Sequence, residues 1–365
     1  MVKFQVNRDV LADAVAWTAR VLPGRPAVPV LSGLLLEAGD GLRVSAFDYD
    51  VSARAEVEAD VAEPGRVLIP GKVLAEITRS LPDRPVEFLR SGSEVVLTCG
   101  SAEFGLLTMP DGDFPSIPAM PPKVGAVGGG LFATAVGQVA SAASRDDTLP
   151  MLTGIRIDID GVQMSMAATD RYRIAARDFL WHPERQDERH AVMVPARVLV
   201  EVARSLRGGE VTIGLDDNVA GFESQGRITT VRLLDDQFID YRSRLTADWA
   251  IHAELDVAPF VEAIKRVVLV AERNTAVRLS FSQGRVLIQA GGGDIGRGAE
   301  VLEAELDGDD IQIAFQPHFL LDGLAGVETE RARLEMDSPT RPALIANAGD
   351  DPDFRYLVMS LRLAG

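Results

Sequence analysis

The chain has 365 residues and a formal net charge of −17, and 47% of its residues are hydrophobic although only 6% are aromatic. This length suffices for several hydrophobic cores, and the aliphatic composition favours β-rich packing. The single cysteine, Cys99, excludes an internal disulfide and a thiolate metal cluster, and its neighbours predict a half-buried strand residue. No apolar run approaches the roughly 18 residues of a membrane span, and no signal peptide opens the chain, so we expect a cytoplasmic protein.

The first third of the chain predicts two helices among short strands. The expected helices cover 10–22 and 72–81, and the expected strands cover 34–37, 42–47, 52–57, 67–69, 86–89, 94–98 and 103–108. The segment 110–130 is rich in proline and glycine, which predicts a linker that forms neither a helix nor a ladder.

The remaining two thirds predict the same order of elements twice more. The second third predicts helices over 131–143 and 196–206, and strands over 154–159, 163–168, 172–179, 191–194, 210–215, 218–223 and 227–234. The last third predicts a helix over 258–272, a strand-to-helix joint over 311–324, and strands over 277–282, 285–290, 298–306, 331–336, 342–346 and 355–363.

One sequence pattern occurs three times along the chain. Residues 65–81 read GRVLIPGKVLAEITRSL, a strand that meets a proline and enters a helix whose expected apolar face carries Val73, Leu74, Ile77 and Leu81. The pattern returns at 191–206 and 311–324, a period of roughly 120 residues, which is an ordinary domain size. Coincidence between common joints is the alternative, but PVLSG and PMLTG, which begin at Pro29 and Pro150, repeat in phase. The pattern therefore predicts three tandem α+β domains, each with two helices backed by antiparallel sheets, over 1–122, 129–246 and 250–365.

Charge is distributed unevenly among the predicted elements. The average charge argues against a nucleic-acid partner, because phosphate binding needs local positive charge. Counted with their flanking residues, over 9–22, 71–84, 131–143, 196–207, 258–273 and 316–327, the six helix candidates together carry +2, so that the acidic charge lies on strands and loops. Ordinary solvation of strands and loops explains this pattern equally well.

Catalytic motifs are missing from the sequence. The four histidines occur without HExxH, GxSxG or a Walker loop, and the acidic pairs at 146–147, 216–217 and 309–310 fit turns better than metal ligands. We therefore expect no catalytic residue, no metal and no cofactor.

The run ATDRYRIA, residues 168–175, is a polar block that enters a strand pattern. Alone it is also typical of a charged edge strand. Together with the triple repeat, PVLSG at 29–33, DYR at 240–242 and VMSLRL at 358–363, it resembles the bacterial DNA polymerase III β subunit family, the sliding clamps. The resemblance covers essentially the whole chain. It implies a non-enzymatic homodimer that closes head to tail into a six-domain ring, with helices lining the hole around duplex DNA and strands outside.

The resemblance also implies three sets of site residues. The DNA-facing basic positions are Arg25, Lys72, Arg79, Arg197 and Arg204, each of which could instead lie on a solvated helix face. A pocket for short linear motifs would be formed by Leu152, Thr169, Arg171, Tyr172, Arg173, Ile174, Ile239, Met359, Ser360, Leu361 and Arg362. The dimer interface would pair Phe104 and Leu106 with Val268 and Leu269.

The partners implied are double-stranded DNA of any sequence, the DNA polymerase III alpha subunit, the clamp loader delta subunit and other proteins with clamp-binding motifs, at the nucleoid and without a membrane. Three positions depart from the family: Ile239 and Ser360 replace common prolines, and Glu103 replaces a common base. Two readings therefore stay open, a clamp-fold peptide-binding scaffold that does not close on DNA and an inhibitor-resistant clamp copy with an altered pocket. A third reading is an enzyme that uses Asp170 and nearby arginines on a phosphorylated substrate.

Overall fold

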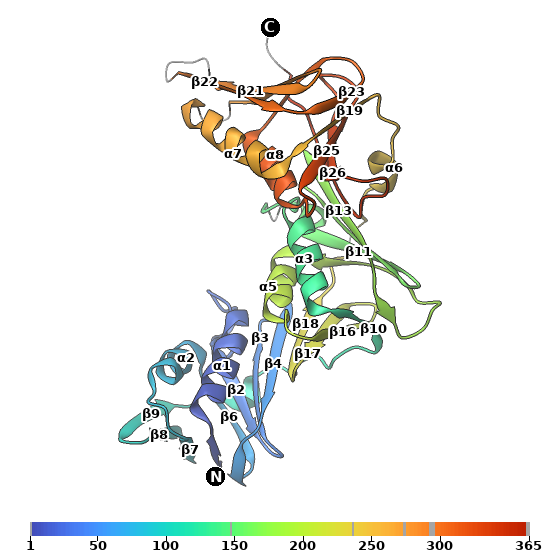
Figure 1. Cartoon of the computed structure of the whole chain (residues 1–365). Coiled ribbons are helices and arrows are strands. Elements are labelled where there is room, and N and C mark those ends of the chain that lie inside the picture. The colour runs from blue at the N-terminus through green and yellow to red at the C-terminus, as the bar shows by residue number, and fades with distance from the viewer. Residues whose placement is uncertain (1, 147, 236, 273–274, 292–295, 363–365) are drawn as a thin grey trace. The chain divides into compact units, whose positions relative to one another are not determined.

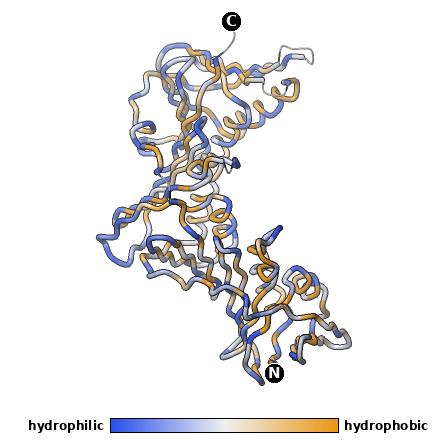
Figure 2. Tube along the Cα trace, turned by 180° about the vertical axis from the view of Figure 1, so that it is seen from behind, coloured by the Kyte–Doolittle hydropathy of each residue, from blue (hydrophilic) through white to orange (hydrophobic). Residues whose placement is uncertain are grey.

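The computed structural model describes residues 2–146, 148–235, 237–272, 275–291 and 296–362 (Figure 1). The chain forms two compact units, one of residues 1–130 with 201–233 and the other of residues 131–200 with 234–365. Figure 2 shows hydrophobic and hydrophilic residues interspersed along the trace, as expected of short, half-buried elements.

The first unit contains two antiparallel sheets and two longer helices. Its helical segments are α1 (Arg8–Thr18), η1 (Ala19–Val21), η2 (Pro29–Ser32), α2 (Gly71–Ser80) and η3 (Asp111–Asp113). Its strands are β1 (Lys3–Val6), β2 (Gly33–Ala38), β3 (Leu42–Phe47), β4 (Val51–Val57), β5 (Asp60–Glu63), β6 (Gly65–Pro70), β7 (Val86–Ser91), β8 (Glu94–Cys99), β9 (Ala102–Leu107), β10 (Lys123–Gly128), β16 (Glu210–Leu215), β17 (Val219–Ser224) and β18 (Arg227–Arg232). One sheet has the order β5-β1-β7-β8-β9, and the other runs β10-β16-β17-β18-β4-β3-β2-β6 within this unit.

The second unit is built in the same way. Its helical segments are α4 (Pro150–Thr153), α6 (Arg242–Leu245), α7 (Val257–Val267), η4 (Val268–Val270) and α8 (Pro317–Ala325), while α3 (Gly129–Ala140) and α5 (Ala196–Ser205) each cross the division between the units. Its strands are β11 (Gly154–Asp160), β12 (Gln163–Thr169), β13 (Arg173–Leu180), β14 (His182–Pro183), β15 (Arg189–Pro195), β19 (Ile251–Asp256), β20 (Val277–Ser282), β21 (Arg285–Gly291), β22 (Arg297–Glu303), β23 (Glu305–Asp307), β24 (Ile311–Phe315), β25 (Arg331–Met336), β26 (Ala343–Asn347) and β27 (Phe354–Val358). The sheets run β15-β11-β12-β13-β27-β26-β25-β19-β23 and β22-β21-β20-β24.

The repeated strand-to-helix joints fold as predicted. Strand β6 enters α2 at Pro70, β15 enters α5 at Pro195, and β24 enters α8 at Pro317. The other repeated landmark also folds alike, because short helices η2 and α4 precede strands that begin at Gly33 and Gly154. Both glycines are closely covered: a Cβ atom would lie 2.7 Å from Leu68 Cδ1 at the first and 2.8 Å from Leu234 Cδ1 at the second.

The same strand junction occurs once in each unit. In the first unit, β4 pairs antiparallel with β18, and Ser52 Oγ lies 2.6 Å from Thr230 Oγ1. In the second unit, β13 pairs antiparallel with β27. Strand β4 is the third strand of the run β2-β3-β4 in the first repeat, and β13 is the third strand of the run β11-β12-β13 in the second. Strand β18 is the last strand of the second repeat, and β27 is the last strand of the third. In both junctions, the third strand of such a run therefore joins the last strand of the next repeat.

Several sequence predictions were wrong in detail. The expected linker contains β10, whose Val124, Ala126 and Val127 are buried and whose backbone pairs with β16, because tertiary pairing outweighs the low strand propensity of glycine. Val73 is exposed and does not belong to the buried face of α2. Cys99 is fully buried rather than half-buried, and its Sγ donates to the carbonyl oxygen of Pro82 at 3.3 Å.

Other differences concern the ends and the number of elements. The last strand was expected over 355–363, but β27 ends at Val358. The expected helices over 10–22 and 258–272 end in 3₁₀ turns, η1 and η4. The sequence did not predict the edge strand β5, nor β1 and β19, each of which pairs with a strand on both sides.

Candidate functional site

A cavity of about 530 Å³ lies in the second unit, beside the β13–β27 junction. Ile174 and Leu357 face each other across this junction and both line the cavity. Met359 continues the wall past the end of β27, where its backbone N–H donates to the carbonyl oxygen of Tyr172 at 2.8 Å. The volume falls in the usual range for a small-ligand or side-chain pocket.

A tight turn between β12 and β13 carries the polar rim of the cavity. Asp170 Oδ1 accepts hydrogen bonds from the backbone N–H groups of Tyr172 at 3.0 Å and Arg173 at 3.1 Å. Arg171 takes φ = +80°, a left-handed conformation that costs a non-glycine residue roughly 1 kcal/mol. The turn therefore keeps Tyr172 on the surface, where 60% of the residue is exposed.

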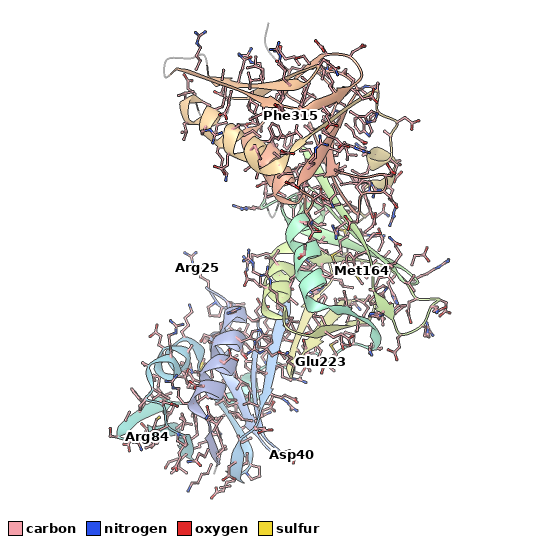
Figure 3. The ribbon with its side chains drawn as sticks, viewed as in Figure 1. Arg25, Asp40, Arg84, Met164, Glu223 and Phe315 are labelled. Carbon is pink, nitrogen blue, oxygen red and sulfur yellow. The ribbon has the colours of Figure 1, made fainter. Side chains whose placement is uncertain are left out.

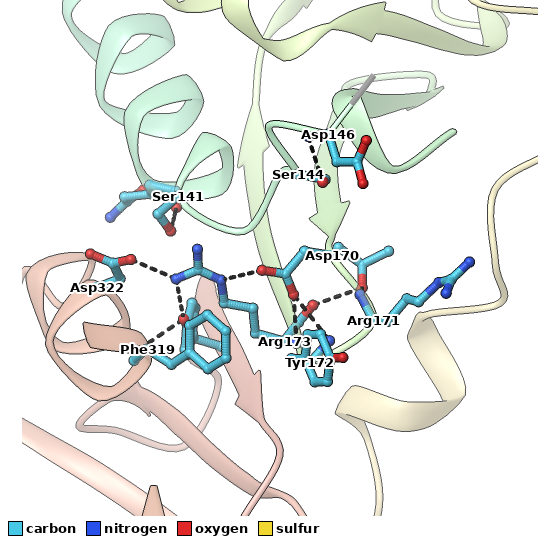
Figure 4. Close-up of polar contacts among 12 residues, drawn as sticks. Ser141, Ser144, Asp146, Asp170, Arg171, Tyr172, Arg173, Phe319 and Asp322 are labelled. Carbon is cyan, nitrogen blue, oxygen red and sulfur yellow. Dashed lines mark hydrogen bonds and ion pairs between the residues drawn. The ribbon is translucent and has the colours of Figure 1, made fainter. Parts of the chain in front are cut away.

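Arg173 is held by partners from three elements (Figure 4). Its Nε lies 2.8 Å from Asp170 Oδ2, and its Nη1 lies 2.5 Å from Asp322 Oδ2 on α8 and 3.1 Å from the Tyr356 hydroxyl on β27. Its guanidinium also lies over the Phe319 ring, 4.4 Å from the centroid, which suits a cation–π contact. One arginine thus links the rim of the cavity to α8 and β27.

Burial and charge shift the pKa values of this cluster. Burial acts to lower the pKa of Arg173, but Tyr356, Asp322 and Asp170 together raise it above its ordinary value. Burial raises the pKa of the Tyr356 hydroxyl, although Arg173 opposes this rise. In the core cluster that contains Ile174 and Leu357, burial and the neighbouring Asp158 carboxylate raise the pKa of Tyr241, whose hydroxyl donates to Asp158 Oδ2 at 3.1 Å. The cluster around Arg173 therefore holds a permanent cation beside the neutral phenol of Tyr356.

Most of the pocket residues that were expected from the sequence line this cavity. Eight of the eleven line it: Leu152, Thr169, Arg171, Tyr172, Arg173, Ile174, Ile239 and Met359. The other three, Ser360, Leu361 and Arg362, do not line it, because the chain turns away and the Leu361 N–H donates to the carbonyl oxygen of Ala314 on β24 at 2.7 Å. Sequence reasoning missed the remaining lining residues, which are Met151, Arg244, Ala247, Trp249, Asp337, Arg341, Pro342 and Leu357. Two of them, Arg244 and Ala247, lie just beyond the DYR motif, which is the nearest sequence signal.

The expected DNA-facing residues are all exposed. Lys72 and Arg79 lie on α2 with Glu76 between them at the i, i+4, i+7 spacing of one helix face. On α5, Arg197 and Arg204 flank Glu201 at the same spacing, and Arg204 Nη1 lies 3.3 Å from Glu201 Oε1.

Arg25 lies in the loop after η1, and its side chain extends away from the ribbon in Figure 3. Each helix stripe therefore presents two cations and one anion, which gives a mildly basic face.

The expected interface residues lie at two sheet edges. Phe104 and Leu106 lie on β9, the outermost strand of its sheet, half-buried against the core of the first unit. Leu269 is 80% exposed on η4, and the half-buried Val268 precedes it. Segment η4 packs against β22, the outermost strand of the other small sheet. Glu300 on β22 forms hydrogen bonds of 3.0 and 2.5 Å with Arg266 of its own chain.

Metal-binding and membrane-spanning features are not found in the part of the chain that the structure describes. No group of three or more histidine, cysteine, aspartate or glutamate side chains there could hold a metal ion. Asp216 and Asp146 instead accept backbone hydrogen bonds within turns, as the sequence predicted. None of the described helices combines the length and the apolar character that crossing a membrane requires.

Comparisons with known proteins agree along the whole chain. Family models for the N-terminal, central and C-terminal domains of the DNA polymerase III beta subunit match residues 2–118, 127–240 and 243–362. The beta sliding clamp of Streptomyces coelicolor is 48% identical over 100% of both chains, and the beta sliding clamp homolog GriR of Streptomyces muensis is 44% identical over 99% of both. The crystal structure of the DNA polymerase III subunit beta of Pseudomonas aeruginosa is 27% identical, with a TM-score of 0.93 over 99% of this chain and 100% of that one.

Proposed function

Because the chain belongs to the DNA polymerase III beta subunit family, the sliding clamps, we propose that two copies close into a six-domain ring around duplex DNA and tether replication proteins to it. The ring would be a processivity factor without chemistry of its own. The domains would cover 1–122, 129–246 and 250–365, with β10 extending the central domain toward residue 123 because it pairs with β16.

The repeated strand junction carries this proposal. Within the chain, a third strand joins the last strand of the next repeat twice, as β4–β18 and β13–β27. The third strand of the third repeat, β22, and the last strand of the first repeat, β9, are both at the edges of their sheets. Pairing β22 of one copy with β9 of another would make the same junction between chains. Two such contacts close a dimer and leave neither β9 nor β22 as an open edge.

The side chains at these edges suit such a contact. Leu107 and Val301 are exposed on β9 and β22, and long exposed apolar edges are otherwise aggregation hazards. Phe104 and Leu106 would then pack on Val268 and Leu269 of the partner. Sedimentation should detect a dimer at sub-micromolar concentration, and Leu269→Asp should shift it to monomer.

The mildly basic helix faces fit sliding on DNA. A closed ring is retained by topology, so phosphate contacts can be weak, and weak contacts exchange as the ring moves. Lys72, Arg79, Arg197, Arg204 and Arg25 would supply these contacts. Because contacts to phosphates carry no direct sequence information, the ring would accept any duplex.

The cavity beside β13–β27 would bind extended peptides from partner proteins. Its apolar walls suit leucine or phenylalanine anchors, and its polar rim can orient the peptide. The partners would include the DNA polymerase III alpha subunit and the clamp loader delta subunit, in the cytoplasm at the nucleoid. A Pseudomonas aeruginosa sliding clamp has been crystallised bound to griselimycin, and we propose that this compound would also bind the present chain.

Loading on DNA tests the ring directly. The protein would be assembled on nicked circular DNA with a clamp loader and then separated by gel filtration. Retention on the circle and release after linearisation are the expected results. Equal retention on both forms would contradict topological linkage, and loss from both would favour a peptide-binding scaffold that does not close on DNA.

A further inference from the structure

The polar groups that line the cavity are unequally satisfied. Four arginines and one aspartate line it. Arg173 is neutralised by Asp170 and Asp322, and Arg341 Nη1 pairs with Asp337 Oδ2 at 3.1 Å. Arg171 and Arg244 form no ion pair with any residue that the structure describes, and both are exposed. The lining is therefore cationic in a chain of net charge −17.

A third donor is also without a partner. The Trp249 indole Nε1 is buried and has no hydrogen-bond acceptor among the described residues, while its ring lines the cavity. An indole nitrogen only donates, and a buried donor without an acceptor costs about 1–3 kcal/mol. The lining aspartate is already occupied, because Asp337 Oδ1 accepts the Ala250 N–H at 3.1 Å and Oδ2 accepts Arg341. An occupant would therefore have to supply acceptors.

The position of Arg171 makes its charge available. Figure 4 shows its side chain pointing away from Arg173 and its partners. The left-handed backbone at Arg171 sets the direction in which its side chain leaves the turn, and the Thr169 Oγ1 accepts its backbone N–H at 3.2 Å. Arg244 lies on α6, the short helix that follows the buried Tyr241.

We propose that this pocket selects peptides that carry a carboxylate side chain beside their apolar anchors, and that Arg171 and Arg244 are the specificity-determining residues. This inference rests on the proposed function of the cavity as a peptide pocket. The apolar walls bind the anchors, and the two guanidinium groups without ion pairs to described residues bind the carboxylate. Charge-assisted hydrogen bonds of this kind are stronger than neutral ones.

Fluorescence anisotropy with three labelled octapeptides tests the proposal. All three carry the same leucine and phenylalanine anchors, and the flanking position is glutamate, glutamine or lysine. At low salt we expect the glutamate peptide to bind about tenfold more tightly than the glutamine peptide, and the lysine peptide to bind least. Added salt should reduce the glutamate preference, because exposed charges are screened.

Variants assign the preference to residues. Arg244→Gln and Arg171→Asn, the latter chosen because asparagine tolerates a positive φ, should each reduce the tenfold preference to roughly threefold, and together they should abolish it. The binding of the glutamine peptide should change less than twofold. Arg285→Gln removes an exposed arginine that does not line the cavity, and it should leave all three affinities unchanged.

The experiment distinguishes failure of the carboxylate preference from failure of the peptide pocket itself. Equal binding of the glutamate and glutamine peptides, with both bound, would overturn the carboxylate preference and leave the peptide pocket intact. Failure of all three peptides to bind would overturn the pocket and the preference together.

Discussion

Arg173 ties the rim of the cavity to α8, so its removal should loosen a defined part of the second unit. Its side chain is only 10% exposed, and it forms charge-assisted hydrogen bonds with Asp170 and Asp322. Arg173→Met keeps the aliphatic stem and removes the guanidinium. The carboxylates then lose their shared cation, while Asp170 still accepts the backbone N–H groups of the turn.

The expected cost can be bounded from the geometry. A hydrogen bond to a charged group contributes about 1.5–3 kcal/mol, and two such bonds are lost. The side chain of Asp322 is 45% exposed, so water replaces much of its interaction, and the buried arginine no longer has to be desolvated. We therefore expect about 2–3 kcal/mol.

Hydrogen exchange measured by mass spectrometry on the full chain reports this cost locally. Peptides from β13 and α8 should exchange about 30- to 150-fold faster in Arg173→Met, because each 1.4 kcal/mol corresponds to about tenfold. Arg185→Met is the matched control, since that side chain is 69% exposed and should change exchange less than twofold. A change below about threefold for Arg173→Met would show that the cluster adds less than about 0.7 kcal/mol to the stability of this region, which contradicts the expected cost.

Three further changes test packing and charge. Gly326→Ala should destabilise the second unit by about 2–3 kcal/mol in urea unfolding, because its Cβ would lie 2.2 Å from Phe354 Cζ, and an unchanged midpoint would contradict this packing. Gly137→Ala, in the exposed middle of α3 with nothing within 4 Å of the added Cβ, should instead stabilise by about 1 kcal/mol, and a loss of stability would count against an open helix face. The hydrogen bond from Arg266 lowers the pKa of Glu300, so its stabilising effect should be complete above the ordinary pKa of about 4.3 and disappear as the pH falls through the lowered folded value. Melting temperatures of the protein and of Glu300→Gln should therefore differ at pH 7 and converge as the pH falls through the lowered pKa of Glu300, and a difference that persists under the most acidic conditions that keep the protein folded would exclude this cause.

The elements and the triple repeat could be predicted because they depend on local pattern. The joints at Pro70 and Pro195 combine an apolar strand, a proline and an amphipathic helix, and each of these is readable within about 15 residues. Strand β10 could not be predicted in this way. Its glycine-containing segment becomes a strand only because β16, more than eighty residues later, pairs with it.

The cavity could be predicted only in part, for a similar reason. The turn at Asp170 was visible as a polar block, and the family resemblance supplied half of the residues that line the cavity. Asp322, which holds Arg173, lies 149 residues away along the chain, and nothing local marks the pair. Trp249 and Arg244 likewise line the cavity only because of the path that the chain takes after Tyr241. Side chains that meet through tertiary structure leave no periodic trace in the sequence.

The β4–β18 and β13–β27 junctions are built alike, and the residues in which they differ explain why the second has the charged rim. The turn before β4 is built like the turn before β13, since Asp48 Oδ1 accepts the N–H groups of Asp50 and Val51 and Tyr49 takes φ = +76°.

The registers also correspond, because Val51 lies opposite Val231 as Arg173 lies opposite Val358. The first junction has buried Val51 where the second has Arg173, and so it has no cation to hold α8, Tyr356 and the turn in one cluster. The repeat therefore determines where two domains join, whereas differences between the copies, Tyr49 against Arg171 and Val51 against Arg173, give the second junction its charged rim.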